Sequence, residues 1–189
     1  MMKVTGVVGS PRKNGNTHII TEHALRAVAE EGIETEVITL SGKDIRHCDG
    51  CQICHGTEER CRIEDDLMPV YEKLKVSDGI ILASPVYYGS ATSLMKALMD
   101  RVGYIGGQRR VFAGKVGGPL VVARRAGHNF THAQMEFWFH ILGFTMPGST
   151  YWNIAFGREK GEVTGDEEGM ATAWNFGKNM AYLVKKLNK

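Results

Sequence analysis

The chain has 189 residues, enough for one medium-sized α/β domain to bury a core without disulfides or a structural metal. Its 23 Lys and Arg residues and 21 Asp and Glu residues give a formal charge of +2, which excludes the strongly basic surface of a nucleic-acid or anionic-membrane binder. We therefore expect a single domain over residues 1–189 whose partners are small molecules and proteins.

The compartment follows from what the sequence does not contain. Residues 1–9 have one Lys and too short an apolar run for a signal peptide, and no apolar stretch approaches the length of a membrane span. We expect a cytoplasmic protein without membrane contact. In that reducing compartment, cysteines serve metal or redox chemistry rather than disulfides.

The first part of the chain alternates strand and helix patterns. An apolar strand over Lys3–Val8 precedes a polar loop and a helix over 17–31, which Gly32 closes. Residues 35–40 alternate as a second strand. An irregular insertion over 41–64 follows, and a helix is expected over 67–74.

The second part continues the alternation. Residues 79–83 form a nearly all-apolar strand, which is typical of a parallel sheet buried on both faces. The remaining expected elements are a helix over 93–101, an irregular stretch over 103–114, a strand over Val116–Ala123, a helix over 132–142, a fifth strand within 145–154 and a helix over 170–187. This alternation predicts a doubly wound parallel sheet with helices on both faces.

A polar loop, GSPRKNGNT at 9–17, joins the first strand to the first helix. At such a position backbone N–H groups, hydroxyls and the helix dipole can together hold an anion. The loop is not the G-x-G-x-x-G dinucleotide loop, and Asn16 stands where the nucleoside-triphosphate loop has Lys, so a phosphate monoester is favoured. The alternative is a polar turn capped by Asn16 or Thr17.

Two further loops are expected at the same edge of the sheet. The segment SPVYYGS at 84–90 lies just past the buried third strand, where open parallel sheets bind ligands. Its tyrosines can form a wall for a flat ring, and a surface turn is the alternative. The segment ARRAGH at 123–128 follows the fourth strand, and its arginines either bind an anion or are simply solvated.

These loops, the helix sequence LMKALMDR at 94–101 and the cysteine block resemble the NADPH-dependent FMN reductase and iron–sulfur flavoprotein group. The resemblance implies a flavodoxin-like fold with strand order 2-1-3-4-5 and noncovalent FMN. It places the FMN phosphate on Ser10, Arg12, Asn14, Asn16 and Thr17. It places the flavin ring along Pro85, Val86, Tyr87, Tyr88 and Gly89. We also expect Arg124, Arg125 and Gly127 to contact the FMN. No catalytic side chain is expected, because the flavin performs the chemistry.

The four cysteines lie within fourteen residues of the insertion, with the spacing C-x2-C-x2-C-x6-C at Cys48, Cys51, Cys54 and Cys61. Such a group can wrap one four-iron cluster, with each thiolate ligating a different iron, and iron–sulfur flavoproteins carry a similar block. Thiols without a metal are the second alternative, since similar flavin reductases keep comparable cysteines. Zinc, with His47 or His55 as a substitute ligand, is the third.

The resulting hypothesis is an FMN-dependent oxidoreductase that NAD(P)H reduces and that passes electrons to a small-molecule or protein acceptor by a ping-pong scheme. The alternative is an electron carrier that receives electrons from ferredoxin through a four-iron cluster, without productive nicotinamide binding. A regulatory module that binds no flavin is a third class. We expect a homodimer or homotetramer that buries exposed apolar residues such as Trp138 and Trp152.

Overall fold

The computed structural model, which describes residues 1–56 and 59–188, contains a five-stranded parallel sheet. The strands are β1 (Lys3–Val8), β2 (Glu34–Thr39), β3 (Gly79–Pro85), β4 (Val116–Ala123) and β5 (Ile154–Phe156). Their order is β2-β1-β3-β4-β5, and every pairing is parallel. This is the flavodoxin-like order, so the predicted fold class is confirmed.

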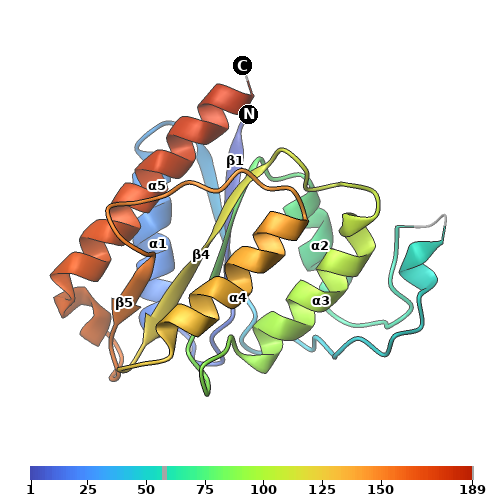
Figure 1. Cartoon of the computed structure of the whole chain (residues 1–189), viewed down its shortest axis with the longest axis horizontal. Helices are drawn as coiled ribbons and strands as arrows, with labels where there is room; N and C mark the ends of the chain where they lie inside the picture. The colour runs from blue at the N-terminus through green and yellow to red at the C-terminus, as the bar shows by residue number, and fades with distance from the viewer. Residues whose placement is uncertain (57–58, 189) are drawn as a thin grey trace.

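Helices cover both faces of the sheet, as Figure 1 shows. They are α1 (Asn16–Ala29), α2 (Leu67–Lys75), α3 (Ser93–Gly107), α4 (His128–Ile141) and α5 (Glu167–Leu187). One apolar core lies between the sheet and α1 with α5, and the other lies between the sheet and α2, α3 and α4. Because β3 and β4 are buried on both faces, they are almost continuously apolar.

Helix α1 is held close to α5 and to β1 by two glycines. A Cβ atom at Gly177 of α5 would lie 2.2 Å from the carbonyl oxygen of Ala24, so only glycine allows this approach. A Cβ at Gly6 of β1 would lie 2.7 Å from the Thr21 side chain of α1. These contacts fix the N-terminus of α1 relative to the end of β1.

Four predicted boundaries are wrong. The fifth strand comprises only Ile154–Phe156, which begins at the last residue of the expected window and ends beyond it, because only these residues pair with Val121–Ala123. Helix α3 continues through part of the expected irregular stretch, since Val102 and Ile105 extend its buried face. Helix α4 begins at His128 rather than at 132. Helix α5 begins at Glu167 rather than at 170, because Asp166 caps it: the Asp166 side chain accepts a hydrogen bond from the Gly169 N–H at 3.0 Å.

The insertion 41–64 follows β2 as predicted, and in its described part it contains one 3₁₀ turn, η1 (Ile53–His55). In Figure 1 it projects beyond α2 and α3, away from the rest of the molecule. Trp138 of α4 packs in the core and donates from Nε1 to the carbonyl oxygen of Met99 at 2.7 Å, so it is not available to a second subunit. None of the described helices is long and apolar enough to cross a membrane.

Candidate functional site

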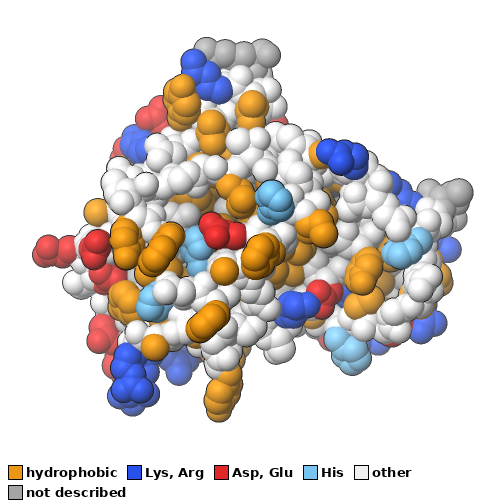
Figure 2. All heavy atoms as spheres, viewed as in Figure 1, with side chains coloured by type: hydrophobic (Ala, Val, Ile, Leu, Met, Phe, Trp, Pro, Cys, Tyr) orange, Lys and Arg blue, Asp and Glu red, His pale blue; other side chains and the backbone are white. Residues whose placement is uncertain are grey.

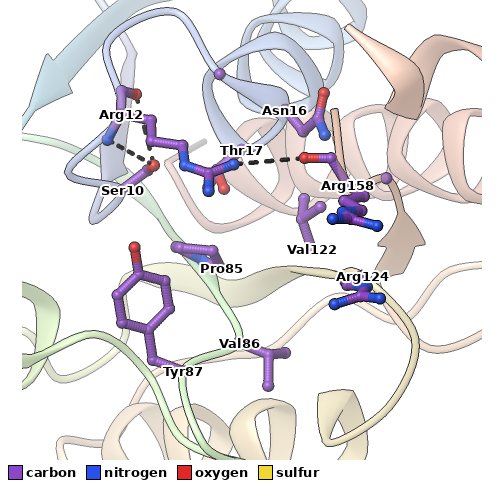
Figure 3. Close-up of a pocket in the computed structure, with 12 residues that line it drawn as sticks. Ser10, Arg12, Asn16, Thr17, Pro85, Val86, Tyr87, Val122, Arg124 and Arg158 are labelled. Atoms are coloured by element: carbon purple, nitrogen blue, oxygen red, sulfur yellow. Dashed lines mark hydrogen bonds between the residues drawn. The ribbon is translucent and has the colours of Figure 1, made fainter. Parts of the chain in front are cut away.

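A cavity of about 320 Å³ lies at the carboxyl edge of the sheet; we call it the edge cavity (Figure 3). Loops that follow β1, β3, β4 and β5 form its walls. Eight of the residues predicted from the sequence line it: Ser10, Arg12, Asn16, Thr17, Pro85, Val86, Tyr87 and Arg124. The remaining lining residues are Gly15, Val122, Gly157 and Arg158. The structure therefore brings three loops of the sequence prediction to one cavity and adds a fourth.

The loop after β1 presents a helix N-terminus to this cavity. Helix α1 begins after Gly15, with no capping hydrogen bond from a side chain and no acidic residue in its first turn. Its first N–H groups therefore carry partial positive charge without an internal acceptor. Ser10 and Thr17 are buried beside them, and the Ser10 hydroxyl accepts from the Arg12 N–H at 3.1 Å. This arrangement is suited to an anion.

The two predicted asparagines of this loop have different positions. Asn16 uses its side chain to hold the loop after β5: Nδ2 donates to the carbonyl of Glu159 at 2.8 Å, and Oδ1 accepts from the N–H of Gly161 at 2.8 Å. Asn14 is exposed, has φ of 50° and is not among the residues that line the cavity. Its left-handed backbone, which Asn tolerates, makes the turn before α1.

The loop after β3 forms the opposite wall through Pro85, Val86 and Tyr87 (Figure 3). Tyr87 and Ser90 exchange backbone hydrogen bonds of 2.9 and 3.1 Å around a two-residue turn. Both turn residues have positive φ, 52° at Tyr88 and 77° at Gly89. This is the hairpin turn type that normally requires Gly or Asn, so Tyr88 occupies a strained conformation.

The loop after β4 divides its residues between two hollows. Arg124 lines the edge cavity and also an adjoining shallow depression, where it lies with Arg125, Tyr88 and Gly89. Gly127 lines neither hollow; it precedes α4 with φ of 85°. A Cβ there would lie 3.0 Å from the Val86 side chain, so this glycine lets the second and third loops pack together.

Charge in the edge cavity has one sign. Arg12, Arg124 and Arg158 line it, and no Asp or Glu is among its described lining residues. Arg12 reaches across it and donates to the carbonyl oxygen of Arg158 at 3.4 Å (Figure 3). The sequence prediction missed Gly157 and Arg158, because it placed the fifth strand too early. The sequence did contain a signal for this loop, because Gly157 and Arg158 directly follow the apolar triplet 154–156.

A second, smaller cavity is lined by Cys48, Cys51, Cys54 and Cys61; we call it the cysteine cavity. Cys51 is exposed, and the other three thiols are partly buried. Two left-handed residues, Gly50 with φ of 71° and Gln52 with φ of 60°, turn the chain between the first three cysteines. The cavity therefore collects all four predicted ligands, although two of them are separated by residues outside the described part of the chain.

The thiols are not arranged as a mononuclear metal site. No group of three or more His, Cys, Asp or Glu side chains is placed to hold a single metal ion within residues 1–56 and 59–188. Neither His47 nor His55 lines the cysteine cavity. Burial raises the pKa of Cys54, and the three neighbouring cysteines raise it further. The described residues therefore show four thiols at one cavity but no formed metal site, whether for zinc or for a cluster.

Residues 2–159, a range that includes every loop of the edge cavity, match the NADPH-dependent FMN reductase family. The chain belongs to this family. It is thus a member of a family of FMN-dependent flavoprotein oxidoreductases, as the resemblance of its motifs implied.

Several relatives of this chain carry the name iron–sulfur flavoprotein. One from Methanocaldococcus jannaschii is 42% identical over 197 residues, and the comparison covers 100% of both chains. One from Methanosarcina thermophila is 34% identical over 191 residues, covering 100% of this chain and 98% of the relative. The solved structure of RosB with bound 8-demethyl-8-formylriboflavin 5'-phosphate superposes with a TM-score of 0.79 at 21% identity, covering 100% of this chain and 81% of RosB. That likeness shows a shared fold.

Proposed function

We propose that this chain binds one FMN in the edge cavity, is reduced by NAD(P)H and passes the electrons to a small-molecule or protein acceptor. The observation that carries this proposal is the uncapped N-terminus of α1, which faces a cavity with three arginines and no carboxylate. A phosphate monoester is the FMN group that needs such a site, whereas a neutral ligand would gain little from it. The volume of about 320 Å³ lies at the lower end of the range for ligand cavities.

Each wall of the edge cavity has a proposed role. The N–H groups of α1 with Ser10, Arg12 and Thr17 bind the phosphate, while Asn16 acts through the loop that it holds. The flat surface of Pro85, Val86 and Tyr87 orients the ring. We assign Tyr88, Gly89, Arg125 and Gly127 to the rim, because the first three line the adjoining depression and Gly127 positions it.

When bound, FMN accepts a hydride and releases electrons singly or in pairs, and the protein supplies orientation and electrostatics. The arginines of the edge cavity favour negative charge on the bound ring, and Arg124 reaches both the cavity and the depression beside it. We propose that donor and acceptor use the same exposed face of the ring beside Tyr87, which is 45% exposed. They therefore bind one after the other, which is a ping-pong scheme.

The test separates phosphate binding from ring binding. Thr17→Val removes one hydroxyl beside the phosphate, so FMN affinity should fall by about 10-fold to 150-fold if a hydrogen bond of about 1.5–3 kcal/mol to a charged group is lost. Riboflavin, which has no phosphate, should bind the variant and the wild type equally. Thr17→Asp should lower FMN affinity further, because its carboxylate repels the phosphate. The variant should still fold, since a carboxylate interacts favourably with the N-terminus of α1. Equal weakening of FMN and riboflavin would overturn the assignment.

A second candidate function is an iron–sulfur electron carrier that accepts electrons from ferredoxin. Two observations favour it: four thiols line one cavity, and two relatives are named iron–sulfur flavoproteins. A four-iron cluster takes one thiolate on each iron, so the four cysteines that line this cavity match the number and kind of ligand that such a cluster needs.

Two anaerobic measurements distinguish the candidates. Rapid bleaching of the flavin by NADH or NADPH supports the reductase, and bleaching only by reduced ferredoxin supports the carrier. Iron and acid-labile sulfide analysis tests the cluster directly, and Cys51→Ala should abolish its visible absorbance while FMN binding persists. Stoichiometric flavin without iron or sulfide after reconstitution would reject the cluster.

We also propose that the chain forms a homodimer or homotetramer through α4. Phe130, Phe137 and Ile141 lie on one face of this helix and are exposed, and so are Tyr151 and Trp152. Figure 2 shows hydrophobic side chains gathered on the face where α4 lies. An exposed apolar group of this kind is typical of a protein interface. Sedimentation as a flavin-bound monomer of 20.9 kDa would contradict the proposal.

A further inference from the structure

Arg101 of α3 is a buried cation whose partners belong to the segment that carries the cysteines. Its side chain is 1% exposed. One terminal nitrogen bonds the Asp65 carboxylate and the carbonyl oxygen of Arg46, the latter at 3.0 Å. The other donates to Asp65 Oδ1 at 3.1 Å, to the carbonyl of Ile63 at 3.3 Å and to Cys61 Sγ at 3.3 Å. A single guanidinium thus joins α3 to both ends of the insertion.

Anchoring by itself does not explain why this residue is charged. Burying an ion pair costs solvation energy, and apolar side chains of similar volume often stabilise a protein equally well. Asp65 is completely buried and neutralises Arg101. The charge of this pair therefore adds little to stability. Among the bonds of Arg101, the contact with the Cys61 sulfur is the one that reaches a proposed cluster ligand.

Arg101 also lines the cysteine cavity itself. Its Nε–H is buried and has no hydrogen-bond partner among the described residues. A buried donor without an acceptor is costly, so its presence at a cavity lined by four thiols fits an acceptor that occupies the cavity. Thiolate and sulfide sulfurs of an iron–sulfur cluster are acceptors of that kind.

We propose that Arg101 is a positioning residue of the cysteine cavity: it orients Cys61 and donates hydrogen bonds to the sulfur atoms of the cluster. The inference rests on the cluster proposed above. Hydrogen bonds to sulfur stabilise the more negative, reduced state of a cluster, and therefore raise its reduction potential.

The experiment uses the anaerobically purified, full-length protein with FMN and reconstituted iron and sulfide. Arg101→Lys keeps the charge but loses the planar fork that contacts Asp65 and Cys61 together. We expect the cluster potential to shift to a more negative value and iron retention against a chelator to fall about 10-fold, as for other residues that orient metal ligands. FMN content should not change. The matched control is Arg46→Lys, because the Arg46 side chain pairs with Asp44 and Asp65 in the same segment.

The outcomes are distinguishable. If the wild type holds no iron after reconstitution, the proposed cluster fails and the role of Arg101 fails with it. If the wild type holds a cluster and Arg101→Lys changes neither potential nor iron retention, only the role of Arg101 is overturned. Should Arg101→Lys not fold, the pair Arg101→Met with Asp65→Leu removes both charges together and leaves none unpaired. That variant should fold, bind FMN and show the same negative shift or lose its cluster; an unchanged potential would overturn the proposal.

Discussion

The edge cavity and the cysteine cavity are both formed by irregular segments, but those segments are held in place by different means. Three of the four loops of the edge cavity continue directly from the inner strands β1, β3 and β4, and the fourth follows the short edge strand β5, so the sheet fixes where each loop begins. The cysteine insertion begins after the edge strand β2 and is held by side chains, above all by Arg101 with Asp65. Arg109 adds bonds to the carbonyl oxygens of Cys54 and Gly56.

This difference predicts that the two cavities respond separately to substitution. A site supported by strand ends shares the stability of the whole core, whereas a site supported by one buried ion pair depends on that pair. The insertion should therefore be disrupted locally while the edge cavity keeps its shape. Three predictions test this separation.

The largest expected effect is that of Asp65→Asn. The substitution leaves Arg101 buried without a counter-charge, which should cost about 3–5 kcal/mol, mostly in the insertion and in the start of α2. Asp65 also accepts from the N–H of Leu67 at 3.1 Å, and because the amide oxygen of Asn can accept the same bond, the loss should come from the missing charge rather than from the cap of α2. Urea unfolding followed by circular dichroism measures the loss in the free energy of unfolding, and limited proteolysis shows which segment of the chain is destabilised.

The control for this prediction is Asp44→Asn. Asp44 is exposed and its carboxylate lies 3.9 Å from Arg46, so its removal should change the free energy of unfolding by less than about 0.5 kcal/mol. FMN affinity should be the same for both variants. A loss of FMN affinity in Asp65→Asn as large as its loss of stability would show that the two cavities are one cooperative unit.

A smaller effect is expected from pH and should appear in α4, the helix that follows the third loop of the edge cavity. Burial lowers the pKa of His132 in α4, and Glu136 only partly opposes this shift. The folded state therefore binds fewer protons than the unfolded state below the ordinary histidine value, and stability should fall as the pH decreases from about 7.5 to about 5.5. Burial also opposes ionisation of Asp65, but its bonds to Arg101 outweigh this effect and lower its pKa, so the anchor of the insertion stays charged.

Hydrogen exchange resolved by segment measures this contrast. Exchange from α4 should accelerate between the two pH values after correction for the intrinsic rate, while exchange from residues 44–56 and 59–67 should not. His132→Gln should abolish the pH dependence in α4. If exchange from the insertion accelerates at a higher pH than exchange from α4, the Arg101–Asp65 ion pair is not the dominant anchor of the insertion.

The smallest expected effect concerns one strained residue in each region. Tyr88 has φ of 52° and Gln52 has φ of 60°, and Asn tolerates this backbone better than either. Tyr88→Asn and Gln52→Asn should each raise the free energy of unfolding by up to about 1 kcal/mol. If Tyr88→Asn also weakens FMN binding whereas Gln52→Asn does not, the strain at Tyr88 serves the cofactor. Destabilisation by both would show that the side chains themselves are needed.

The sequence by itself determined the order of strands and helices, the polar loop before the first helix and the grouping of the cysteines. These features depend on local patterns: apolar runs such as 79–83 indicate buried strands, a polar glycine-containing loop before a helix indicates an anion site, and four close cysteines need no fold to be noticed. The loops that follow β1, β3 and β4 could be placed at one edge because parallel strands end on the same side of a sheet.

Only the tertiary structure decided which residues act across long separations. The short strand β5 exists because Ile154–Phe156 pair with Val121–Ala123, and this pairing brings Arg158 to the edge cavity. Asn16 was predicted to bind phosphate, but its side chain holds a loop more than a hundred positions away. Arg101 looks like a solvated residue of a helix in the sequence. Its burial depends on Asp65 and Cys61, because the energy of a buried charge is set by the partners that the fold brings to it.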